Sequence, residues 1–187
     1  GVFDTSEVDQ GGKCEFDLTE LESIKISGSL KTSRATALRL SKLKMLSVLS
    51  EVLDNPRYAQ PRFNEATSLQ FERSANEVAL RNLDLESDGL LSLQGDLREV
   101  SGRLEGQLRV GIPELIASAA PVREVPLVFR ESEGGYLWCS VTVSGTSSAP
   151  VDDLSDQFQA AQDGSLPRAE SSGGLDDEFE SLTTPDR

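Results

Sequence analysis

Residues 76–113 alternate apolar and polar side chains almost without interruption. The run reads NEVALRNLDLESDGLLSLQGDLREVSGRLEGQLRVGIP, and glycines break it at positions 89, 95, 102 and 106. Alternation with a period of two places successive side chains on opposite faces of a β-strand, so each strand has one apolar and one charged face. Turns of a few residues separate the strands, so we expect neighbours to pair antiparallel. The run therefore predicts a sheet that needs cover on one face.

Segments on both sides of this run alternate in the same way. We predict a strand at residues 23–30, one from Thr67 onward, and strands within 123–132 and 136–145, with a further one possible around Cys14, Phe16 and Leu18. The strand within 123–132 would place Val125, Leu127 and Phe129 on one face. In the last strand Leu137, Cys139, Val141 and Val143 share a face, and Tyr136 and Trp138 lie opposite. Because that strand starts apolar on both faces, we expect a helix or a partner to cover it there.

One step in the alternation has the wrong parity for a regular strand. Val78 and Leu80 share a face, and so do Leu83 and Leu85, but the step from Leu80 to Leu83 is odd. An extra residue in one strand of a pair restores the facing, and such an insertion is a β-bulge. We therefore predict a bulge or twist near Arg81 and Asn82.

The helical signal is strongest in TALRLSKLKMLSVLSEVLDNP. Leucine, methionine and valine recur there at helical spacing, which predicts one main helix from Leu38 to Leu53. Thr36 or Ser41 could cap its start, and Asp54-Asn55-Pro56 ends it because proline disfavours helical geometry before it. Its wide apolar face favours packing onto the sheet, with lipid or partner binding as the alternative. Shorter segments with helical spacing follow Pro113 and Pro150, and we expect a short helix at each place.

The net charge of −14 lies at the two ends of the chain. Residues 1–22 carry −6 and residues 152–187 carry −8, whereas residues 23–151 are neutral. This distribution argues against a nucleic-acid partner, because phosphate contacts need clustered Lys and Arg. We expect an acidic flexible segment at 1–22 with a possible strand, a β-rich domain at 23–163, and a disordered acidic tail at 164–187. Solvated termini and an acidic recognition tail, in which LDDEFESL would be a partner motif, are the two interpretations of these ends.

Residues suited to catalysis or metal binding are scarce. The sequence contains no histidine, which removes the commonest general base and metal ligand, and its two cysteines, Cys14 and Cys139, lack metal-site spacing. They form either one disulfide or two ordinary thiols. The carboxylates Asp84, Glu86, Asp88 and Asp96 fall on the polar strand faces, where a solvated surface is favoured over a hydrolase pair. We therefore expect no enzyme, no cofactor and no metal.

The predicted sheet has more apolar face than one helix can cover. Either the sheet curls on itself, or something outside this chain completes it, since large exposed apolar areas mark interaction surfaces. A groove for acyl chains and an ordinary core are the alternatives for the residues on this face. The candidate lining residues are Leu69, Phe71, Val78, Leu80, Leu91, Leu93, Leu104, Leu108 and Val110.

The order of these features resembles the C-terminal region of bacterial AsmA-like envelope proteins. A strand and a Leu-rich helix are followed by FNEATSLQFERSANEVALRNLDLESDGLLSLQGDLREVSGRLEGQLRVGIP and a closing VTVSGTSSAP at 141–150, and the likeness covers about residues 23–155. It implies a mainly β (α+β) fold, a curved, groove-like antiparallel sheet with one main packing helix. The acidic tail is not part of this pattern.

The resemblance also implies a location and a function. Such regions belong to periplasmic proteins that a transmembrane segment anchors in the inner membrane, and they are associated with phospholipid transport between membranes or with envelope integrity. This chain shows no apolar run of about 20 residues and no signal peptide, so it would be the soluble piece of a longer parent, with the membrane reached through a missing anchor. Its expected partners are phospholipid acyl chains and adjacent domains. The competing hypothesis is an assembly module that pairs strands edge to edge with neighbouring domains.

Overall fold

The computed structural model describes residues 3–4, 15–16, 26–31, 38–40, 43–63, 65–74 and 76–166. A large antiparallel sheet of nine strands dominates it, and the expected mainly β fold, a curved antiparallel sheet with a packing helix, is confirmed. The tail beyond residue 166, Cys14 and most of the acidic segment at 1–22 lie outside the described residues. Within that acidic segment, the strand expected around Phe16 is present as a two-residue strand.

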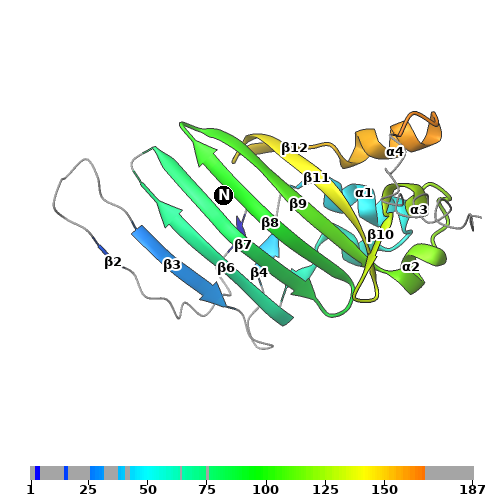
Figure 1. Cartoon of the computed structure of the whole chain (residues 1–187), viewed down its shortest axis with the longest axis horizontal. Coiled ribbons are helices and arrows are strands. Elements are labelled where there is room, and N and C mark those ends of the chain that lie inside the picture. Colours follow the sequence, from blue (N-terminus) through cyan, green and yellow to red (C-terminus); the bar gives the residue numbers. More distant parts are fainter. Residues whose placement is uncertain are drawn as a thin grey trace, which may run out of the picture.

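Consecutive strands of the alternating run lie side by side in the large sheet (Figure 1). Their order is β10-β11-β9-β8-β7-β6-β3-β2, and β12 also pairs with β11. The strands of this sheet are β2 Glu15–Phe16, β3 Ile26–Lys31, β6 Glu65–Arg73, β7 Glu77–Ser87, β8 Leu91–Val100, β9 Arg103–Pro113, β10 Glu131–Glu133, β11 Tyr136–Thr146 and β12 Ala149–Asp152. A second sheet, with the order β1-β4-β5, is made of β1 Phe3–Asp4, β4 Leu38–Leu40 and β5 Arg62–Phe63.

The helices gather at the end of the large sheet where β10 and β11 lie, away from β3 (Figure 1). They are α1 Lys44–Val52, the 3-10 helix η1 Pro56–Ala59, α2 Glu114–Ser118, α3 Val125–Val128 and α4 Leu154–Gln162. We call the sheet face beneath them the inner face and the opposite face the outer face. The buried leucines and valines of β7, β8, β9 and β11 form one core with α1, α3 and α4. Several helices together therefore supply the cover that the sequence seemed to lack.

The main helix is shorter than the sequence predicts. Residues 38–40 form β4, with Leu38 paired to Phe63 of β5, so α1 begins only at Lys44. The residue that precedes α1 is Leu43, which offers no side-chain cap, and the predicted caps Thr36 and Ser41 lie outside the described residues. Instead, the backbone N–H of Met45 donates to Oδ2 of Asp152, 107 residues away, at 2.8 Å. The helix start is thus set by tertiary contacts, because strand pairing competes for its first turn and a remote carboxylate satisfies an N-terminal donor.

The strand predicted through Val125, Leu127 and Phe129 is wrong. This segment forms the one-turn helix α3, in which Val125 and Val128 are buried while Leu127 is 49% exposed. Pro126 lies in the first turn of this helix, where its missing N–H costs no hydrogen bond, whereas in a strand it would remove a ladder bond. The helices predicted after Pro113 and after Pro150 are both present as α2 and α4.

The predicted bulge is confirmed. The register between β7 and β8 shifts between Leu80 and Leu83, and Asn82 adopts a left-handed φ of 52°. The Asn82 N–H, displaced from the ladder, donates to Oδ1 of Asp96 at 2.8 Å. Facing the bulge, Gly95 has a φ of 138°, and a Cβ there would lie 2.2 Å from the carbonyl oxygen of Gln107. Glycine is therefore required where β8 approaches β9 this closely.

Candidate functional site

The inner face of the large sheet carries the nine residues predicted to line a groove. Six of them are buried in the core. The other three lie near the β3 side of the sheet: Phe71 and Leu80 are partly buried, and Val78 is 37% exposed. The buried six are Leu69, Leu91, Leu93, Leu104, Leu108 and Val110.

The three accessible residues form one continuous patch, which we call the open apolar patch. Phe71 of β6 lies directly opposite Leu80 of β7. Val78 lies two positions before Leu80 on β7 and therefore on the same face. Leu80 in turn pairs with the buried Leu97 of β8. The apolar inner face thus continues from the helix-covered core into a surface that solvent reaches.

Charged residues end the open apolar patch. Val78 pairs on one side with Arg73 and on the other with Glu99, so all three side chains share the inner face. Arg73 is exposed and Glu99 is half-buried. The open apolar patch therefore consists of apolar side chains with a cation and an anion beside Val78, at one end. This arrangement is complementary to an amphiphile.

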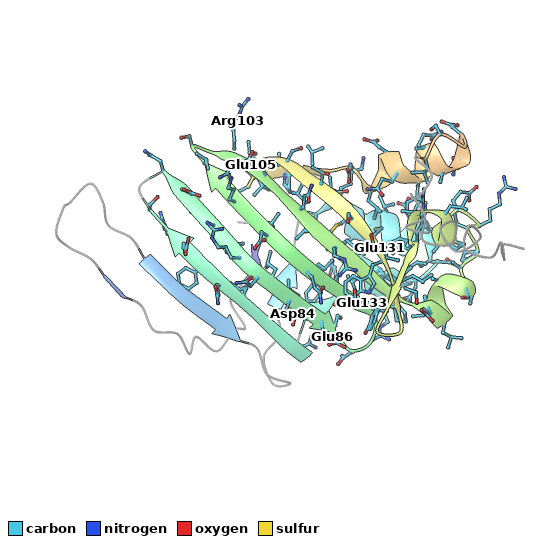
Figure 2. The ribbon with its side chains drawn as sticks, in the orientation of Figure 1. Asp84, Glu86, Arg103, Glu105, Glu131 and Glu133 are labelled. Carbon is cyan, nitrogen blue, oxygen red and sulfur yellow. The ribbon has the colours of Figure 1, made fainter. Side chains whose placement is uncertain are left out.

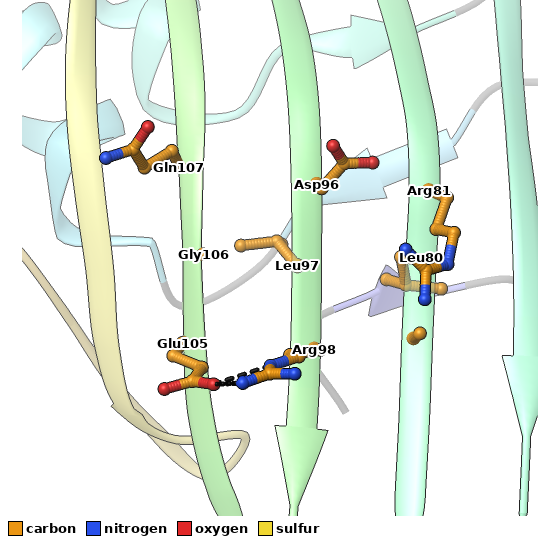
Figure 3. A pocket seen from close by; sticks show the side chains of 9 residues that line it. Leu80, Arg81, Asp96, Leu97, Arg98, Glu105, Gly106 and Gln107 are labelled. Carbon is orange, nitrogen blue, oxygen red and sulfur yellow. Dashed lines mark hydrogen bonds and ion pairs between the residues drawn. The ribbon is translucent and has the colours of Figure 1, made fainter.

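The outer face is a surface of paired charges, and most of the acids labelled in Figure 2 lie on it. A depression of about 380 Å³ crosses β7, β8 and β9 on this face. Figure 3 draws the side chains that line it. Arg98 forms an ion pair with Glu105 at its edge, and Arg81 pairs with Glu72 at 3.3 Å. Carboxylates therefore neutralise both guanidinium groups, and the remaining acid of the depression, Asp96, accepts the backbone N–H of Asn82. Its lining residues are Ala79, Leu80, Arg81, Asp96, Leu97, Arg98, Glu105, Gly106 and Gln107.

A second cluster on the outer face surrounds Trp138. The sequence predicted that a helix or a partner would cover this part of the strand. The guanidinium of Arg109 lies over the indole at 4.8 Å and bonds Glu131 at 3.0 Å and Glu133 at 2.9 Å. These hydrogen bonds, the one to Glu133 above all, raise the pKa of Arg109. The indole Nε1 donates to the Glu133 carbonyl, and Trp138 is only 5% exposed. Neighbouring strands thus cover Trp138, a packing hinted at by Gly111, which leaves room for the ring.

The predicted carboxylates and cysteine occupy separate, ordinary environments. Asp84 and Asp96 are exposed on the outer face, where Asp84 accepts a weak bond from Gln94 and Asp96 serves the bulge. Glu86 accepts from the Tyr136 hydroxyl at 3.4 Å. Cys139 is a free, buried thiol, and burial raises its pKa. In the described part of the chain, no three His, Cys, Asp or Glu residues are grouped as a metal site.

No model of a known protein family, no curated protein and no solved structure matches this chain. The helices that the structure describes are all too short or too polar to cross a membrane. The geometry of the inner face is therefore the main guide to function.

Proposed function

We propose that this chain is a non-enzymatic module of a periplasmic envelope protein whose apolar sheet face accommodates phospholipid acyl chains. The observation that carries the proposal is the passage of the inner face from a helix-covered core to the open apolar patch. Burying an acyl chain against such a surface is favourable by about 25 cal/mol per Å² of apolar area removed from water. A parent anchored in the inner membrane would bring the module close to its lipid.

The charged end of the patch supports a phospholipid over a plain hydrocarbon. Arg73 and Glu99 flank Val78 on the same face, so a bound chain could lie along Phe71 and Leu80 with its headgroup near these two charges. A zwitterionic headgroup carries one charge of each sign, and both have a counterpart here. The outer face, with its paired charges, would remain in water.

The test compares two valines of equal exposure on opposite faces of the same sheet region. Val78 and Val100 are each 37% exposed; Val78 lies on the inner face, and Val100 lies on the outer face because it pairs with Glu77. We expect Val78→Asp to weaken binding of a fluorescent fatty-acid probe by about tenfold or more, because a carboxylate must be desolvated in the apolar path. Val100→Asp should leave binding unchanged. Equal binding by the two variants would contradict the proposal.

A second measurement addresses the natural ligand. Organic extraction of the purified chain followed by mass spectrometry should recover phospholipid from the wild type and less from Val78→Asp. Circular dichroism of each variant checks that the sheet is intact. We expect the wild-type spectrum for both, because both substitutions fall at partly exposed positions.

The assembly function is the second candidate, and the open margin of the sheet at β3 favours it. Only Ile26 and Ser27 of β3 pair with β2, so residues 28–31 have no strand partner on that side among the described residues. Unpaired strand margins can accept an added strand through main-chain hydrogen bonds. A lipid-free chain that self-associates would favour this function over the lipid-binding one.

A further inference from the structure

Strand β11 lies near one margin of the large sheet and is incompletely paired there. On the edge that faces the middle of the sheet, β11 pairs with β9 from Tyr136 to Val143. On its other side β10 covers residues 136–138 and β12 covers residues 143–146. Between them, residues 139–142 have no strand partner in the described part of the chain.

Two side chains from the start of α4 fill this gap, and we call them the edge cap. The Thr142 N–H donates to Oδ1 of Asp153 at 2.9 Å, and the Ser140 carbonyl accepts from Nε2 of Gln157 at 2.7 Å. Gln157 also donates to Asp153 at 3.1 Å, which holds the two side chains together. The Asp153 N–H completes the cap by donating to the Thr142 carbonyl at 3.3 Å. The two side chains thus occupy the Thr142 N–H and the Ser140 carbonyl, backbone groups that another strand could otherwise bind.

The sequence of β11 explains why its margin needs covering. YLWCSVTVSGT contains no charged residue and no proline, and it is rich in β-branched and aromatic residues. Among the strands that the structure describes, β11 is the only one without a charged residue. Segments of this composition pair readily with copies of themselves, and natural sheets usually place charges on such margins.

We propose that Asp153 and Gln157 block a latent strand-pairing site, and that without them β11 pairs antiparallel with β11 of a second copy. A second copy fits because pairing about a two-fold axis near Ser140 and Val141 sets uncharged side chains against uncharged side chains. The small polar residues Ser140 and Thr142 would meet on the outer face. This inference does not depend on lipid binding.

The experiment uses the full chain with the double substitution Asp153→Ala/Gln157→Ala. We expect sedimentation velocity to show a concentration-dependent dimer that the wild type does not form over the same range. Far-UV circular dichroism should stay unchanged. Gln159→Ala is the matched control, because Gln159 lies on the same helix and its side chain donates to Asp163 on α4's own C-terminal side. A double variant with the oligomeric state of the wild type would overturn the proposal.

A third substitution locates the new contact. Ser140 is exposed, so Ser140→Lys leaves the core untouched while placing like charges close together in a β11–β11 pair. Added to the double variant, it should restore the wild-type sedimentation, and a dimer that persists would show that the contact lies elsewhere. If the double variant unfolds, Gln157→Ala alone frees the Ser140 carbonyl and should dimerise at higher concentration. A Gln157→Ala chain that sediments like the wild type would then reject the proposal.

Discussion

The two ends of the inner face share one sequence pattern but differ in cover. Leu93 and Val78 are both apolar residues in alternating strands, yet Leu93 is 1% exposed and Val78 is 37% exposed. The helices gather over the end that includes β9 and β11, whereas the open apolar patch lies toward β3 (Figure 1). Alternation therefore identifies the face that is apolar, and the surrounding elements determine how much of it water reaches.

The largest expected difference in stability comes from placing a carboxylate at the covered end and at the open end of the inner face. Leu93→Asp buries an unpaired carboxylate and should cost several kcal/mol, enough to unfold the domain. Val78→Asp should cost under about 1 kcal/mol, because its side chain reaches solvent. Urea unfolding followed by circular dichroism measures both. A folded, stable Leu93→Asp chain would show that the covered end is not a close-packed core.

Removal of the remote helix cap should have the next largest effect, at the covered end. Asp152→Ala leaves the Met45 N–H without its acceptor and should cost about 1–3 kcal/mol. Asp152→Asn keeps an oxygen acceptor and should cost less. The comparison tests whether Asp152 attaches α1 to β12, since these two elements are in contact.

The same residue predicts a pH dependence. Burial raises the pKa of Asp152. A carboxyl group that holds its proton more tightly in the folded state contributes less stability as the pH rises from its unfolded pKa, about 4, through its folded pKa. Unfolding free energies across this range should therefore fall less steeply for Asp152→Asn than for the wild type. Parallel curves would show that Asp152 does not titrate in this window.

Gly111→Ala tests the outer face of the covered end. The added Cβ would lie 2.8 Å from the Trp138 ring, which Arg109 and the Glu133 carbonyl hold in place. We expect a loss of about 1–2 kcal/mol by overpacking, measured by urea unfolding. In a Trp138→Leu background the same change should cost less, and an equal cost in both backgrounds would place the strain elsewhere.

The smallest effect is expected from the Arg98–Glu105 ion pair, which lies at the edge of the depression on the outer face of the sheet. Both Arg98 and Glu105 are more than half exposed, and solvent screens such pairs. Arg98→Ala should therefore change the unfolding free energy by under about 1 kcal/mol. Arg109→Ala should cost more, because it also uncovers Trp138. Thermal melts of the two variants measure this order directly, and the reverse order would contradict the packing role of Arg109.

Much of the fold could be predicted from local patterns. The period of two located β7, β8, β9 and β11, and the odd step from Leu80 to Leu83 located the bulge at Asn82. The end of α1 was predicted because Asp54-Asn55-Pro56 stops a helix through local backbone geometry. Leu166, three residues past the predicted domain boundary at residue 163, packs against the core.

The candidate site was predictable only in part. All nine predicted lining residues lie on strands of the large sheet, but six of them are buried in the core that the sheet shares with the helices. The helix at Val125–Val128, which belongs to this core, was predicted as a strand, because four residues fit both periods. The edge cap formed by Asp153 and Gln157 left no signal in the sequence.

By itself, the sequence determined the class of fold, the apolar face of each strand and the places where the chain turns, because these depend on spacing along the backbone. The tertiary structure decided where α1 begins, what covers Trp138 and which part of the inner face stays open. Those features depend on contacts such as Met45 with Asp152 and Gln157 with Ser140. Such contacts join residues distant along the chain, and no local period records which distant group will satisfy a given donor or cover a given side chain.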